Sequence, residues 1–160
     1  MLLNIQTPRL TLLPFTKTIC EETLSNSTSM LTRLGIVPCI GWPDLETLDT
    51  LPRIINNLDK VTEPTGFESW MMIERATNLI IGDIGFKGRP NEAGEIDLGY
   101  GVIASNRKKR FALEAATGIL KWAFNQEKVK AVTASCQIDN LGSQRIYHCS
   151  ISVLLKRRME

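Results

Sequence analysis

Histidine and paired cysteines are scarce in this chain of 160 residues, and their scarcity excludes several kinds of site. The one histidine, His148, cannot build a multi-histidine metal centre. The four cysteines contain no C-x-x-C pair, the spacing typical of zinc and redox motifs. We therefore expect no metal, and we expect reduced thiols in a cytoplasmic protein. These thiols are Cys20, Cys39, Cys136 and Cys149.

Long apolar runs and a large net charge are also missing. Nowhere do about 18 apolar residues follow one another, and the first residues lack the pattern of a signal peptide, so we expect no membrane segment. The formal net charge is only +2, so a preference for anions must come from local clusters of basic residues. The length and the 43% hydrophobic content suit one sizeable core, which predicts a single domain over residues 1–160.

The hydrophobic pattern predicts strands and helices in an α+β order. Amphipathic spacing predicts helices, one of them with a break or kink at Pro52, over residues 19–34, 45–58 and 112–126. Short apolar runs bounded by turn residues predict strands over residues 9–13, 68–74, 79–87, 95–103 and 129–136.

The order of these elements predicts how the sheet is connected. The tight turn at residues 75–78 joins two strands as an antiparallel hairpin. The last two strands are separated by a helix, so they form a crossover and should run parallel. We therefore predict a mixed, mostly antiparallel central sheet flanked by helices. Gly99 and Gly101 lie inside the strand at 95–103 and indicate a bulge or a backbone that a ligand approaches closely.

A run of four basic residues separates that strand from the strongest predicted helix. Arg107, Lys108, Lys109 and Arg110 place positive charge at the helix N-terminus, where the helix dipole is already positive. A bound anion would offset this repulsion, because the first N–H groups of a helix are free to donate to phosphate oxygens. A solvated surface turn with its side chains pointing away is the alternative interpretation.

The same run resembles a known signature. Residues 107–112, Arg-Lys-Lys-Arg-Phe-Ala, are similar to the Q/R-x-x-G-x-G/A motif of the Gcn5-related N-acetyltransferase (GNAT) superfamily, with Arg110 where the family has glycine. Three more segments resemble its strands, specifically in the branch that includes the ribosomal-protein N-terminal acetyltransferases: residues 7–12, 81–85 and 95–103. The resemblance covers about residues 5–147. It implies the acyl-CoA N-acyltransferase (GNAT) fold, acetyl-CoA as co-substrate, and direct acetyl transfer to an amine.

The resemblance also implies roles for individual residues. The loop amides would bind the pyrophosphate of acetyl-CoA, and the backbone at residues 99–103, Val102 and Ile103 included, would pair with the pantetheine arm. Asn140 and Ser143 would contact the same arm. The residues implied for pyrophosphate binding are Arg107, Lys108, Lys109, Arg110, Phe111 and Ala112.

Two proton transfers are needed in such a reaction. Glu95 is the expected base, with Asp97 on the same strand face as a second candidate, and Tyr147 would protonate the departing thiolate. Simpler interpretations stay open for each residue. The two carboxylates could merely face solvent, Asn140 could cap a helix, and Tyr147 could be a buried helix aromatic.

The resemblance ends after Tyr147, and residues 148–160 are atypical. The closing hairpin of the family is missing, which would expose a sheet edge through which two copies could form a homodimer. A non-catalytic acyl-CoA-binding or decayed member of the fold is therefore the competing interpretation. Nucleic-acid binding is not expected, because no aromatic platform accompanies the basic residues. The acceptor, a protein N-terminus or a small-molecule amine, cannot be read from the sequence.

Overall fold

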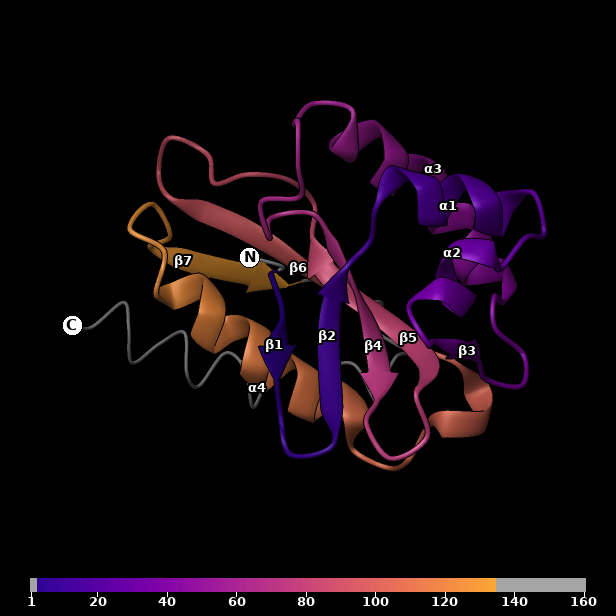
Figure 1. Ribbon diagram of the computed structural model, residues 1–160. Coiled ribbons are helices and arrows are strands. Elements are labelled where there is room, and N and C mark those ends of the chain that lie inside the picture. Colours follow the sequence, from indigo (N-terminus) through magenta and orange to yellow (C-terminus); the bar gives the residue numbers. More distant parts are fainter. Residues whose placement is uncertain (1–2, 135–160) are drawn as a thin grey trace.

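The computed structural model describes residues 3–134 of the chain (Figure 1). The helices are α1 (Lys17–Leu24), α2 (Ser29–Arg33), α3 (Leu45–Leu58), the 3₁₀ helix η1 (Ala104–Asn106) and α4 (Phe111–Phe124). The strands are β1 (Ile5–Gln6), β2 (Leu10–Pro14), β3 (Val37–Pro38), β4 (Ser69–Glu74), β5 (Leu79–Phe86), β6 (Glu95–Val102) and β7 (Ala131–Ala134).

The strands form one mixed sheet in the order β1-β2-β4-β5-β6-β7, with β3 pairing β5 beside this path. Neighbours from β1 to β6 are antiparallel, and β4 and β5 form the predicted hairpin. β6 and β7 are parallel and are joined through α4, as the strand–helix–strand order predicts. The predicted α+β class with a mostly antiparallel sheet is therefore confirmed.

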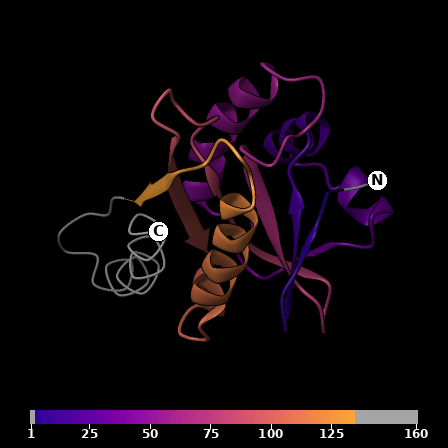
Figure 2. The same cartoon turned by 90° about the vertical axis from the view of Figure 1, so that its left-hand side faces the viewer.

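Helices lie on both sides of the sheet. Figures 1 and 2 show α4 crossing one side, while α1, α2 and α3 gather away from it. Trp122 of α4 packs against the rings of Trp70 in β4 and Phe86 in β5, so these two strands turn those side chains toward α4. Because strand side chains alternate, Asp83 and Gly85 of β5 face the opposite side, toward α3.

Two helix predictions need correction. The region 19–34 is not one helix, because α1 ends at Leu24 and Asn26 takes a left-handed backbone conformation with φ of 61° before α2 begins. At Pro52 the sequence predicts a break or a kink, and a break is wrong, since α3 continues through this residue. Pro52 is exposed, so water can reach the carbonyl that loses its N–H donor, while Leu51, Ile54 and Leu58 hold the helix on the core.

The bulge suggested by Gly99 and Gly101 is not found in the pairing of β5 with β6. That register runs evenly from Phe86 opposite Leu98 to Gly82 opposite Val102. The register shift lies instead between β4 and β5, next to Met72 and Ile73. Of the two interpretations of the β6 glycines, close approach of a ligand is the one that remains.

Candidate active site

The basic residues 107–110 form a loop between η1 and the start of α4. Lys108 and Arg110 have φ values of 63° and 64°, which lie in the left-handed region that favours glycine. Arg110 is also the N-cap residue of α4. The family motif therefore has glycine at this position because the backbone is left-handed there. Arg110 adopts the same backbone conformation in spite of its side chain.

The N-terminus of α4 leaves backbone donors exposed to a ligand. No side chain caps this helix, and its first intrahelical bond runs from the N–H of Glu114 to the carbonyl of Arg110 at 3.1 Å. The N–H groups of Phe111, Ala112 and Leu113 therefore have no partner within the helix. The side chains of Phe111 and Ala112 are buried, so these residues would contact a ligand through their backbone. Such a helix start is a binding site for anions.

The four basic side chains of the loop differ in what they contact. Arg107 donates from Nε to the carbonyl of Val102 at 2.8 Å, which ties the loop to the end of β6. Lys108, Lys109 and Arg110 are exposed, and within residues 3–134 none of them forms an ion pair. The loop thus keeps three unpaired cations beside the uncapped helix start, which makes the local potential positive.

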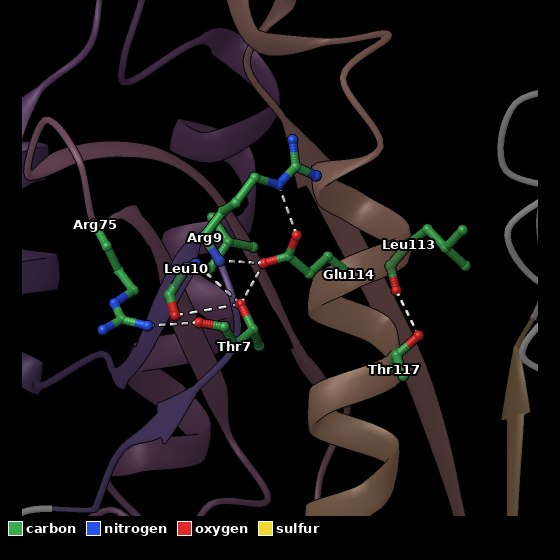
Figure 3. A network of polar contacts seen from close by, with 7 residues as sticks. All are labelled: Thr7, Arg9, Leu10, Arg75, Leu113, Glu114 and Thr117. Atoms are coloured by element: carbon green, nitrogen blue, oxygen red, sulfur yellow. Dashed lines mark hydrogen bonds and ion pairs between the residues drawn. The ribbon is translucent and has the colours of Figure 1, made fainter.

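A network of polar contacts fixes the first turn of α4 to the start of the chain (Figure 3). The Glu114 carboxylate accepts from Thr7 Oγ1, from the Arg9 N–H at 2.8 Å and from Arg9 Nε at 2.7 Å. The Arg9 guanidinium also lies over the Phe111 ring, 4.3 Å from its centroid. Partial burial acts to raise the pKa of Glu114, but the hydrogen bonds from Thr7 and Arg9 outweigh it and lower the pKa.

Fewer backbone N–H groups at the end of β6 are available to the pantetheine arm than the sequence predicts. The Ile103 N–H donates to the Ile81 carbonyl at 2.9 Å, so this predicted pantetheine contact is already engaged within the protein. Partners in an antiparallel ladder alternate along the strand, and the N–H of Val102 therefore points away from β5. Val102 can thus present its amide to a ligand, whereas Ile103 cannot.

A cavity of about 170 Å³ lies between α3 and the sheet. Its floor on β5 and β6 carries Asp83 and the glycines Gly85, Gly99 and Gly101, which leave the backbone open. The side from α3 contributes two carboxylates and one guanidinium. The polar and charged residues that line the cavity are Asp44, Glu46, Thr47, Thr50, Arg53, Ser69, Asp83, Lys87 and Tyr100.

Asp83 is the residue at this site that the sequence analysis missed. Burial raises the pKa of Asp83 to about 7, and the neighbouring carboxylates of Asp44 and Glu46 act in the same direction. The guanidinium of Arg53 opposes the shift. The available signal was a single charged residue within the apolar run Leu-Ile-Ile-Gly-Asp-Ile-Gly-Phe of β5. The raised pKa of Asp83 depends on how α3 packs against the sheet, and a local sequence pattern does not predict that packing.

The two predicted base candidates occupy different positions from Asp83. Glu95 lies at the start of β6, where its N–H donates to Asn91 Oδ1 at 2.9 Å, and it does not line the cavity. Asp97 forms an ion pair with Lys87 at 2.9 Å and accepts from Thr133 Oγ1 at 3.0 Å. The Asp97 carboxylate thus links β5, β6 and β7.

Several predictions fall on residues that the structure does not describe. Asn140, Ser143, Tyr147 and the C-terminal sheet edge lie outside residues 3–134. Within that range, no three acidic, cysteine or histidine side chains gather as ligands for a metal ion. No helix in the same range is long and apolar enough to cross a membrane. Cys20 and Cys39 are buried free thiols, and burial raises the pKa of Cys20 to about 12.

Comparison with known proteins identifies the family. The family model described as an acetyltransferase (GNAT) domain matches residues 9–148. The uncharacterized N-acetyltransferase YjdG of Bacillus subtilis (strain 168) is 36% identical over 104 residues, which are 65% of this chain and 62% of that protein. The aligned part of the chain therefore spans less than two thirds of this relative.

Solved structures agree with the fold. A GNAT-family acetyltransferase from Bacillus anthracis has a TM-score of 0.61 at 21% identity, over 92% of this chain and 82% of that one. RimL, a ribosomal L7/L12 alpha-N-protein acetyltransferase solved in complex with coenzyme A, has a TM-score of 0.64 at 13% identity, over 92% and 82%. At these identities the likeness shows the fold alone. The family match over most of the chain establishes more: this protein belongs to the GNAT acetyltransferase family.

Proposed function

We propose that this protein transfers an acetyl group directly from acetyl-CoA to an amine. The observation that carries the proposal is the uncapped N-terminus of α4, which follows a loop with three cations that form no ion pair within residues 3–134. That arrangement suits a doubly charged pyrophosphate, because it combines backbone N–H groups without a partner in the helix with cationic residues next to them in the chain. Its structural relative RimL was solved with coenzyme A, which supports the same ligand here.

The loop and β6 divide the binding of acetyl-CoA between them. The amides of Phe111 and Ala112 would donate to the pyrophosphate, with Lys108, Lys109 and Arg110 adding charge. Arg107 would act by holding the loop on β6, because its Nε is bound to the Val102 carbonyl. The Val102 amide would contact the pantetheine arm. Asn140 and Ser143 remain proposed contacts of the same arm.

The acceptor would approach from the side of α3. RimL is named for acetylation of a protein N-terminus, and a cavity of about 170 Å³ accommodates a single amine-bearing residue or a small amine. An amine nitrogen attacks the thioester carbon, the C–S bond breaks, and backbone amides stabilise the oxyanion. Tyr147 remains the proposed donor of a proton to the thiolate, and Glu95 the base proposed from the family resemblance.

Calorimetric titration with acetyl-CoA tests the proposal. Lys109→Glu reverses one charge in the loop, at a residue that is not among those with positive φ. The variant should raise the dissociation constant roughly tenfold, which corresponds to about 1.4 kcal/mol. Lys121→Glu is the matched control, because Lys121 is an exposed lysine in the last turn of the same helix. Equal weakening in both variants would contradict a pyrophosphate site in the loop. Absence of binding by the folded wild-type protein would overturn the proposal.

A non-catalytic acyl-CoA-binding protein is the second candidate. Arg110 favours this candidate, because it places a bulky side chain on a left-handed backbone position where the family motif has glycine. Both candidates predict binding of acetyl-CoA, and they differ in turnover. Release of free thiol from acetyl-CoA in the presence of an amine supports the enzyme, whereas saturable binding without thiol release supports the binding protein.

A further inference from the structure

The floor of the cavity, on the face of the sheet toward α3, combines one carboxylate with three glycines. Asp83 pairs with Gly101 across β5 and β6, and Gly85 pairs with Gly99, so one carboxylate stands among three residues without side chains. Asp83 Oδ2 lies 3.8 Å from the position that a Cβ on Gly101 would occupy. The Asp83 carboxylate is therefore directly next to the open strip of backbone on β6.

The charges around this floor favour a cationic or hydrogen-bond-donating group. Glu46 of α3 and Asp44 at its N-cap line the cavity with Asp83, and the positive charge of Arg53 opposes theirs. Lys87 also lines the cavity, but its ammonium is paired with Asp97 at 2.9 Å. Within the described part of the chain, no ion pair or hydrogen bond engages the Asp83 carboxylate. The N–H group of a neutral amine in the cavity would thus meet an unpaired acceptor.

We propose that Asp83 is the catalytic base, and that it takes the proton from the acceptor amine bound in this cavity. The inference rests on the proposed acetyl transfer and adds the residue that performs its first proton transfer. The amine nitrogen forms a C–N bond with the acetyl carbon while its proton passes to the Asp83 carboxylate. The C–S bond then breaks, and the thiolate of coenzyme A takes a proton from a separate acid. The products are the N-acetylated amine and coenzyme A.

The acid–base properties of Asp83 suit this role. Burial raises its pKa to about 7, so the carboxylate is partly ionised at neutral pH and is a stronger base than an exposed aspartate. The charged groups that line the cavity with it are Glu46 and Arg53 of α3, Asp44 at the N-cap of α3, and Lys87, which follows β5. Glu95 lacks this setting, because it lies outside the cavity at the far end of β6.

The test compares Asp83→Asn with Asp49→Asn in the full chain. Asp49 is an exposed aspartate of α3 that does not line the cavity, so its variant controls for the general effect of removing a charge. Glycinamide and ethanolamine serve as probe amines, with free-thiol release as the readout for turnover. Calorimetric binding of acetyl-CoA and thermal unfolding are measured for each variant.

The expected result separates chemistry from binding. Asp83→Asn should lower kcat about 100-fold or more, while the acetyl-CoA dissociation constant and the activity of Asp49→Asn stay within about twofold of wild type. The kcat/KM of the wild type should rise with pH through about 7, and the remaining activity of Asp83→Asn should lack this rise. Gly101→Ala, which keeps Asp83 but narrows the cavity, should raise KM for glycinamide.

Three outcomes would overturn the inference. One is an Asp83→Asn variant with at least half of wild-type kcat. Another is loss of turnover in Glu95→Gln but not in Asp83→Asn. The third is a wild-type protein that binds acetyl-CoA but releases no thiol with either probe, which would leave a binding protein. Failure of the wild type to bind acetyl-CoA would instead remove the proposed function itself.

Discussion

Individual residues in the loop before α4 carry backbone strain next to the proposed cofactor site. Lys108 and Arg110 both have positive φ, and neither is a glycine. A left-handed conformation costs a residue with a side chain roughly 1–2 kcal/mol. The chain therefore gives up stability at the uncapped start of α4, where we propose that the pyrophosphate binds.

Substitution of Arg110 by glycine should make the protein more stable. The gain from relieved strain exceeds the entropy that glycine loses on folding, and we expect the free energy of unfolding to rise by about 0.5–1 kcal/mol. Urea denaturation measures this change. Lys109→Gly is the control, because Lys109 is not among the positive-φ residues, and it should lower the stability by a similar amount. A loss of stability in both variants would show that Arg110 is not strained.

The residues show where sequence reasoning succeeds and where it stops. The sequence has Arg110 where the family motif has glycine, and the φ of 64° at Arg110 explains why glycine is favoured there. The hydrogen bond from the Ile103 N–H to Ile81 is not predictable, because it depends on the register between β5 and β6, and the bond from Arg107 to Val102 depends on how the chain turns through η1. Asp83 is not predictable either, since its burial and the charges around it come from distant segments.

Among the elements, α4 does most to organise the site. Its N-terminus supplies the proposed anion contacts, its apolar face packs on the sheet, and Glu114 in its first turn holds the turn before β2. The segment at residues 7–12 that resembles the family thus has a structural role at Thr7 and Arg9. These residues fix where α4 begins, and so where its free N–H groups point.

Glu114→Gln should weaken this attachment in a pH-dependent way. The pKa of Glu114 is lower in the folded protein than its usual value of 4.5, so its stabilisation is present above that value and is lost as the pH falls through the folded pKa. At pH 7 we expect the variant to be less stable by about 1–2 kcal/mol, since Arg9 is half-exposed to solvent. Denaturation curves at pH 7 and pH 3 should show a smaller difference at pH 3 than at pH 7, and an equal difference would contradict the prediction.

The glycines of β5 and β6 should respond unequally to alanine. A Cβ on Gly85 would lie 2.5 Å from the Cα of Ser69, so Gly85→Ala should lower the free energy of unfolding by about 1–3 kcal/mol. A Cβ on Gly99 would meet nothing closer than Lys87 Cε at 4.0 Å, so Gly99→Ala should change stability by less than about 1 kcal/mol. Chemical denaturation of the two variants tests the contrast, and equal losses would contradict it.

At the scale of the whole molecule, opposite charges gather in two regions. The loop before α4 is cationic, and the cavity under α3 carries the carboxylates. The order of elements was predictable, because hydrophobic periodicity and a strand–helix–strand pattern define the sheet. The cavity was not, because it forms where α3 approaches glycines that are separated from it by more than 20 residues.

Binding of acetyl-CoA should stabilise the whole fold. At a ligand concentration of 100 times the dissociation constant, the gain is about 2.7 kcal/mol, which corresponds to a rise in Tm of roughly 5–10 °C for a domain of this size. Differential scanning calorimetry measures it. Pantetheine at the same concentration lacks the pyrophosphate and should give a much smaller rise, and an equal rise would argue against the loop as the anchoring site.

The attachment of Glu114 to Thr7 and Arg9 has a consequence for synthesis on the ribosome. These partners are 107 and 105 residues apart in sequence, so the contact closes a very long loop. A nascent chain that has emerged only as far as β6 already contains most of the sheet strands but neither Glu114 nor the start of α4. Under the proposed function, a nascent chain can bind acetyl-CoA only after α4 has been synthesised, and shorter chains should not compete for the cofactor.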